Sequence, residues 1–306
     1  MSLPKLLNKP EYWFRPSQIM RKLQYERQSL TEGSRRVRLP WRDDLVVSTG
    51  DAIGRSILTL GVHELVVSEV LWRLAEPGET CLDVGANLGY MTSLLSARTG
   101  WRGRVHAFEP HPAVFARLKS NVVKFANKEA VTVYDNAVGV VDGVADLFES
   151  ADFGANQGTS SLLAANGQAS QLRKHRVGLR RLDSLFAENA AIGLMKIDVE
   201  GAELDVLRGA NGLLAKHQIR DIVWEDHASF PSNSARVLSQ HGYRIFQFVK
   251  KVLGPSFWEP GVGRGTPNLP WETRNYLATL DPVRAESRLR PRGWYCLRGT
   301  KPPCDC

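Results

Sequence analysis

Four residues at one predicted turn have the types needed to hold a nucleotide-like cofactor. Asp83, Gly85, Asn87 and Gly89 follow one another at alternate positions in the stretch LDVGANLGY. The two glycines let the backbone come close to a ligand, because no Cβ stands in the way. A helix that begins at this turn would direct its free N–H groups to the same place. The spacing therefore predicts a cofactor-binding turn.

A fifth candidate, Glu109, ends the apolar stretch RVHAFEP. It lies 20 residues beyond Gly89, the distance at which a β-α-β unit brings a carboxylate to a ribose. A dinucleotide turn needs G-x-G-x-x-G, whereas the register here is G-x-N-x-G, with Asp83 at the strand tip. That acid would repel a pyrophosphate but suits the ammonium and sulfonium groups of S-adenosylmethionine. The turn therefore favours S-adenosylmethionine, and a nicotinamide-dependent oxidoreductase is the alternative on a similar fold.

Further polar side chains are expected at the carboxyl ends of other strands. Asp135 and Asn136 follow the third predicted strand, where they would lie near an adenine, although turn formation explains them equally well. Asp198 ends the buried stretch LMKID, and Glu225 and His227 follow the next apolar stretch. Because the carboxyl ends of parallel strands meet at one crevice, we expect these side chains to lie near Gly85.

Alternating apolar strands and amphipathic helices predict an α/β fold with a doubly wound sheet. The strands are expected at 80–84, 104–109, 130–134, 195–199, 219–224 and 243–249, with a closing strand at 293–297. Residues 138–149, interrupted by Asp-Gly, predict a β-hairpin. Residues 177–179 are expected to return to the sheet. Residues 151–169 are rich in Gly, Ser, Asn and Gln, and we expect a mobile loop there.

Residues 1–50 are expected to form a basic N-terminal extension. Within it, 11–28 predicts an amphipathic helix and 35–47 a small hairpin. Asp51 is expected to cap a helix that ends at residue 60, and 63–75 predicts a second helix with one apolar face. None of these segments carries chemistry unaided, so we expect a lid or wall over the cofactor.

Composition describes an ordinary globular protein of 306 residues, with 43% hydrophobic and 24% charged residues. We expect one main domain at 51–300 and a short tail at 301–306. No apolar run approaches the ~20 residues of a membrane span, and the N-terminus does not resemble a signal peptide.

Four cysteines without framework spacing indicate a reducing, cytoplasmic location. The net charge of +8 is scattered, so it does not favour a nucleic-acid partner. Nothing in the sequence predicts the oligomeric state.

The motifs LDVGANLGY, FEP and KIDVEGAE followed by VLRGA resemble the FkbM family of S-adenosylmethionine-dependent methyltransferases. The similarity runs from about residue 60 to residue 243. KIDVEGAE is the specific part, since DVGAN-type turns occur across many methyltransferases. The resemblance implies a class I methyltransferase (Rossmann-like) fold, with a doubly wound, mostly parallel seven-stranded sheet. It also implies methyl transfer to a hydroxyl oxygen of a sugar, glycan or secondary metabolite.

Given this resemblance, Asp198, His227 and Glu225 are the candidate catalytic residues. The enzyme must align the acceptor oxygen and remove its proton, which a neutral histidine can do near neutral pH. Asp198 is a second candidate base, or it holds His227 in the right tautomer; capping the following helix is its structural alternative. A magnesium ion held by Asp198, Glu225, Asp226 and His227 is a less favoured alternative. An RNA ribose 2′-hydroxyl is the less favoured acceptor.

Overall fold

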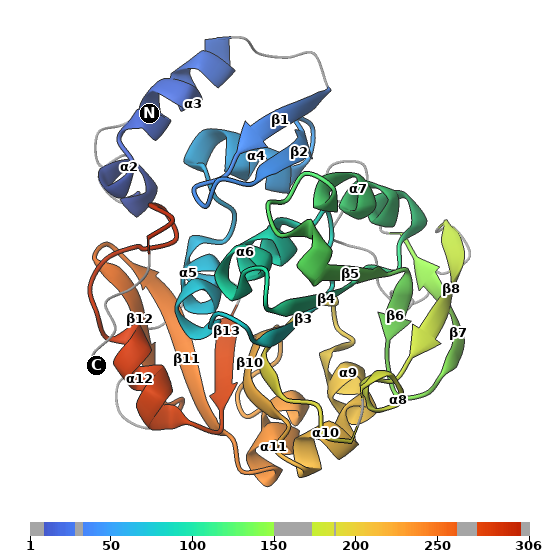
Figure 1. The fold of residues 1–306 in the computed structure, drawn as a ribbon. Coiled ribbons are helices and arrows are strands. Elements are labelled where there is room, and N and C mark those ends of the chain that lie inside the picture. Colours follow the sequence, from blue (N-terminus) through green and yellow to red (C-terminus); the bar gives the residue numbers. More distant parts are fainter. Residues whose placement is uncertain (1–8, 28–32, 150–172, 187, 262–273, 301–306) are drawn as a thin grey trace.

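The computed structural model describes residues 9–27, 33–149, 173–186, 188–261 and 274–300 (Figure 1). Its main sheet has eight strands in the order β12-β11-β13-β10-β9-β3-β4-β5. The five parallel strands are β3 (Thr80–Val84), β4 (Arg104–Phe108), β5 (Val131–Tyr134), β9 (Ile192–Ile197) and β10 (Ile219–Asp226). The antiparallel end is formed by β13 (Arg274–Thr279), β11 (Arg244–Lys251) and β12 (Gly254–Trp258). This order confirms the predicted doubly wound sheet of class I methyltransferases, with one more edge strand, β12, than the seven expected.

Two hydrophobic clusters cover the two faces of this sheet. The helices packed in the first cluster are α4 (Ala52–Leu60), α5 (Leu65–Leu74), α6 (Tyr90–Thr99), α7 (Pro112–Val122) and α12 (Pro282–Leu289). Those of the second cluster are α8 (Leu182–Leu185), α9 (Glu203–Gly209), α10 (Asn211–Ala215) and α11 (Asn233–Gln240). A short 3₁₀ helix, η1 (Lys128–Ala130), precedes β5. In the described part of the chain, no helix is both long and apolar enough to cross a membrane.

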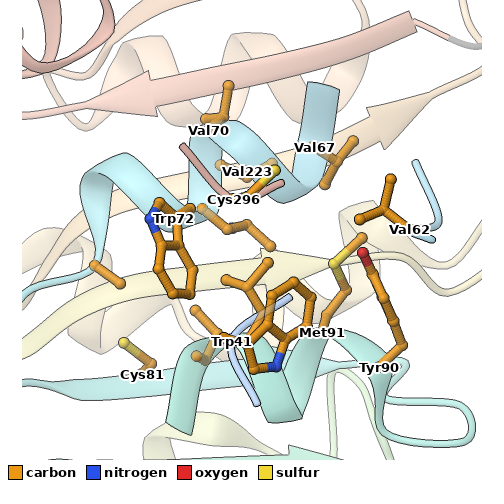
Figure 2. Packing of buried hydrophobic residues seen from close by; sticks show 14 of the residues in the cluster. Trp41, Val62, Val67, Val70, Trp72, Cys81, Tyr90, Met91, Val223 and Cys296 are labelled. Carbon is orange, nitrogen blue, oxygen red and sulfur yellow. The ribbon is translucent and has the colours of Figure 1, made fainter. Parts of the chain in front are cut away.

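The N-terminal residues pack onto the first face. The predicted hairpin is confirmed as β1 (Ser34–Arg38) paired with β2 (Asp44–Ser48). Trp41, in the turn of this hairpin, lies 5.8 Å from the Trp72 ring and 5.5 Å from the Tyr90 ring (Figure 2). Tyr90 is the first residue of α6 and directly follows the glycine turn. These aromatic contacts therefore connect the N-terminal residues to the predicted cofactor-binding turn.

The predicted first helix is divided in two, α2 (Pro10–Phe14) and α3 (Ser17–Arg27). Arg15 between them leaves the helical region, with φ −142° and ψ 73°, as expected for a residue that precedes a proline. The predicted cap of α4 is confirmed, because the Asp51 side chain accepts a hydrogen bond from the Gly54 N–H.

Three strand predictions are wrong. Residues 138–149 do not form a hairpin, because β8 (Lys174–Arg180) lies between β6 (Asn136–Val138) and β7 (Gly143–Phe148) in a separate three-stranded sheet. Residues 177–179 therefore pair in this small sheet and do not return to the main one. The closing strand is β13 rather than 293–297, which forms turns. The predicted loop 151–169 lies outside the described residues.

Candidate active site

A cavity of about 380 Å³ lies at the carboxyl ends of β3, β4, β9 and β10. Its wall contains the predicted site residues Gly85, Asn87, Glu109, Asn136, Asp198, Glu225 and His227. The predicted residues Asp83, Gly89 and Asp135 are not part of the wall. Topology thus brings strand ends that are far apart in the sequence to one place, as the sheet order requires.

The glycine turn has left-handed backbone geometry at three positions. Gly85 has φ +79°, Asn87 φ +49° and Gly89 φ +93°. A Cβ on Gly85 would lie 1.8 Å from the main-chain oxygen of Asp198. The neighbouring strand end therefore excludes a side chain at position 85, and this packing keeps the turn close to the cavity. Gly89 serves packing as well, since a Cβ there would lie 2.8 Å from Leu118.

Glu109 is 7% exposed and supports the turn directly. Its carboxylate accepts hydrogen bonds from the N–H of Asn87 and the N–H of His111, both at 2.9 Å. Burial raises the pKa of Glu109 to about 7, although the two N–H donors act to lower it. The carboxylate thus fixes the shape of the turn and also faces the cavity, where its remaining lone pairs can accept further hydrogen bonds.

Asp83 lies beneath the turn, where it contacts a lysine. Its side chain is fully buried and accepts a 2.6 Å hydrogen bond from the Thr92 hydroxyl. The Lys196 ammonium lies 3.3 Å from Asp83 and 3.4 Å from Asp198, and it donates to the Gly85 carbonyl at 2.8 Å. Burial acts to lower the pKa of Lys196, but the two carboxylates outweigh it and raise that pKa. Lys196 therefore joins the two strand ends to the turn.

His227 is paired with Glu225 rather than with Asp198. The imidazole Nε2 lies 3.5 Å from the Glu225 carboxylate, and the two side chains are 58% and 15% exposed. The carboxylate of Asp226 is turned away: it accepts from the Trp224 indole, the Ala228 N–H and the Ser232 hydroxyl. Asp198 does not cap the next helix either, since α9 begins at Glu203 without a side-chain cap.

Glu64 and Glu200 line the same cavity and were not among the predicted site residues. Both have left-handed backbones, with φ +42° at Glu64 and φ +51° at Glu200. Burial, followed by the charge of Asp198, raises the pKa of each to about 7. Glu200 was visible in the sequence as a strand-end charge. Glu64 gave no signal, because its position depends on how the connection between α4 and α5 folds over the strands.

A family model, described as the methyltransferase FkbM domain, matches residues 83–245. This range holds both the glycine turn and the KIDVEG strand end, and it covers more than half of the chain. The chain belongs to the FkbM methyltransferase family. The expected family resemblance is thereby confirmed.

Three relatives show how far the sequence similarity extends. The chain is 30% identical to the AMB antimetabolite synthetase AmbE of Pseudomonas aeruginosa over 60% of its own length but only 10% of that protein. It is 30% identical to the hexuronic acid methyltransferase AglP of Haloferax volcanii, over 57% of this chain and 67% of AglP. It is 34% identical to the 31-O-demethyl-FK506 methyltransferase FkbM of Streptomyces tacrolimicus, over 49% of this chain and 66% of that enzyme. The chain thus spans a small part of AmbE and about two thirds of the other two relatives.

The predicted magnesium ligands of this FkbM-family protein do not form a ready-made cluster. Across the described residues, the only group of three His, Cys, Asp or Glu ligand atoms within 4.8 Å of one another is His111, Glu149 and His175. The carboxylate of Asp226 already accepts hydrogen bonds from three donors. A magnesium ion at Asp198, Glu225 and His227 would therefore require these side chains to move together.

Proposed function

We propose that the cavity binds S-adenosylmethionine and that the protein transfers its methyl group to a hydroxyl of a sugar, glycan or small secondary metabolite. The observation that carries the proposal is the arrangement of Glu109 and His227 in the wall of one cavity of an FkbM-family fold. Glu109 suits a ribose and His227 suits a hydroxyl that must lose its proton.

The residues of the turn fit an adenosine-containing cofactor. The buried Glu109 carboxylate can accept from both ribose hydroxyls, and Asn136 lies where the adenine edge is expected. The cavity wall carries the acids Glu64, Asp198 and Glu200, which suit the ammonium and sulfonium charges. When bound, the cofactor supplies a methyl group already activated by its sulfonium. Because Asp83 is buried against Lys196, its part in this proposal is to orient the turn and not to contact the ligand.

Removal of the acceptor proton is assigned to His227, with Glu225 beside it. The carboxylate at 3.5 Å orients the ring and stabilises the imidazolium that forms when the proton arrives. Asp198, in contact with Lys196, aligns the acceptor oxygen and is the second candidate for the base. A positioned general base contributes ~10²–10⁴-fold to a rate.

The acceptor class is suggested by two relatives. AglP is named a hexuronic acid methyltransferase, and the Streptomyces FkbM is named a 31-O-demethyl-FK506 methyltransferase. The two names describe a hexuronic acid and 31-O-demethyl-FK506 as the acceptors of those enzymes. The open side of the cavity near His227, which is 58% exposed, can accept part of such a molecule.

A turnover screen tests the proposal. The full chain is incubated with S-adenosylmethionine and with panels of hexuronic acid glycans and hydroxylated secondary metabolites, and S-adenosylhomocysteine and methylated products are measured by mass spectrometry. We expect methyl transfer to oxygen with at least one panel, reduced ~10²–10⁴-fold in His227→Ala. Isothermal titration calorimetry without an acceptor measures S-adenosylmethionine binding independently of turnover. If S-adenosylmethionine does not bind, the proposal is wrong whatever the panel shows.

A further inference from the structure

A second group of potential ligands lies outside the wall of the cavity. His111, Glu149 and His175 come from three different parts of the chain, and their ligand atoms all lie within 4.8 Å of one another. His111 is buried at the start of α7, Glu149 follows β7, and His175 lies in β8. Neither the magnesium prediction nor the proposed methyl transfer uses any of them.

The three side chains already converge on one oxygen. The Glu149 Oε1 lies 3.0 Å from the His111 Nε2 and 2.6 Å from the His175 Nε2. The two imidazole rings are 4.7 Å apart and inclined at 69°, so both nitrogens point toward the same space. Ligands bound tetrahedrally at ~2.0–2.2 Å from a zinc ion lie roughly 3.3–3.5 Å apart. If the distances from the Glu149 oxygen to the two histidine nitrogens each increased by less than an ångström, the three atoms could therefore hold an ion.

His111 is held in place by its neighbours. Its backbone N–H donates a hydrogen bond to the Glu109 carboxylate, and its ring Nδ1 accepts one from the backbone N–H of Val114 at 3.4 Å. Binding through Nε2 would place the ring proton on Nδ1 and remove the contact with Val114. That contact is longer than an ordinary hydrogen bond, so the cost of losing it is small.

We propose that His111, Glu149 and His175 bind a divalent transition-metal ion of the zinc type. Two imidazoles and one carboxylate form a donor set that suits zinc. Magnesium and calcium prefer oxygen ligands. In the described part of the chain three side chains supply ligands, and water completes the coordination.

The ion would connect the small sheet to the main domain. Glu149 directly follows β7 and His175 lies in β8, whereas His111 follows Glu109 by two residues. The ion would therefore fix β7, whose Leu147 lines the cavity, against the start of α7. This role is structural: it requires neither a cofactor nor an acceptor, and it does not depend on the proposed methyl transfer.

Zinc titration of the full chain tests this site. Cys304 and Cys306 are first replaced by serine in every sample, because a Cys-Asp-Cys tail could bind zinc independently. Zn²⁺ affinity is measured by competition with a chromophoric chelator, and Tm is measured with and without Zn²⁺. We expect one tight site per chain and a rise in Tm. His175→Gln and Glu149→Gln should each weaken the affinity at least ~100-fold, since even outer partners of ligands are worth 10–100-fold.

His241→Gln is the matched control, because His241 lies at the end of α11 and contacts Asn211 rather than the cluster. It should leave Zn²⁺ affinity unchanged. Co²⁺ bound to the unsubstituted ligand set should give visible ligand-field bands, a readout that does not depend on the variants folding. If the wild-type ligand set binds no Zn²⁺ and gives no Co²⁺ bands, or if both Gln variants bind Zn²⁺ normally, the three residues form only a hydrogen-bonded cluster and the proposal is wrong.

Discussion

Replacing Glu109 with glutamine should weaken S-adenosylmethionine binding and loosen the turn that holds it. In the wild type both carboxylate oxygens accept backbone N–H groups, from Asn87 and from His111. A glutamine amide can accept only one of these bonds, so its NH₂ group would face the other donor. Leaving a buried donor without a partner costs ~1–3 kcal/mol, and Tm should fall accordingly.

The loss of cofactor affinity follows from the ribose contact. A hydrogen bond to a charged group is worth ~1.5–3 kcal/mol. Each ~1.4 kcal/mol is tenfold in Kd, so the Kd of Glu109→Gln should rise about 10- to 150-fold. The pH dependence is a second readout. Because burial raises the pKa of Glu109 to about 7, wild-type affinity should increase as the pH rises through that value. The variant should show a weaker dependence, since Glu64 and Glu200, whose pKa values are also about 7, still titrate in the cavity.

Isothermal titration calorimetry with S-adenosylmethionine between pH 6 and 8 measures both effects, where the range is set by about one unit on either side of the raised pKa. Glu129→Gln is the matched control, because it makes the same chemical change at an exposed site in η1. Wild-type Kd values and an unchanged pH profile in Glu109→Gln would refute the assignment of Glu109 to the ribose.

Three further predictions concern other groups. His227→Ala should reduce turnover ~10²–10⁴-fold while leaving the Kd of S-adenosylmethionine nearly unchanged; normal turnover would transfer the role of base to Asp198. Gly85→Ala should lower Tm more than Gly78→Ala, because both glycines have φ near +80° but only the Cβ at 85 meets backbone, at 1.8 Å; equal losses would show that conformational strain alone matters. The contribution of Glu109 and Glu200 to the free energy of unfolding should fall as pH rises from about 4.5 to about 7, because the folded state keeps protons on these groups that the unfolded state has lost; if urea titrations at several pH values gave Glu200→Gln the same pH dependence of the free energy of unfolding as the wild type, this would be contradicted.

The part of the cavity formed by the glycine turn was predictable because its signals are local. The residues from Asp83 to Gly89 form one strand end and one turn, and Glu109 ends the next parallel strand. Adjacent parallel strands connected by a helix place such residues together in any doubly wound sheet. Of the seven residues predicted to bind the cofactor, four accordingly line the cavity: Gly85, Asn87, Glu109 and Asn136. Asp83, Gly89 and Asp135 do not line it. The burial of Asp83 against Lys196 depends on the packing of β9 beside β3.

The rest of the cavity and the ends of the sheet depend on long-range packing. Glu64 reaches the cavity through the connection that precedes α5, and no periodicity marks it. The closing strand β13 follows a proline- and glycine-rich stretch that obscures its pattern, and the apolar residues near 295 suggested a strand where the chain instead forms turns. The His111, Glu149 and His175 cluster joins residues 38 and 26 positions apart, and sequence spacing alone does not indicate their proximity.

A crystal structure of the full chain with S-adenosylmethionine tests the central claim most directly. We predict the ribose hydroxyls at the Glu109 carboxylate, within the ~2.5–2.7 Å of hydrogen bonds to an ionised acceptor. The adenine should lie beside Asn136, and the methyl group should face the space between Asp198 and His227. A cofactor bound elsewhere, or bound with its ribose away from Glu109 and its methyl group away from His227, would contradict the account.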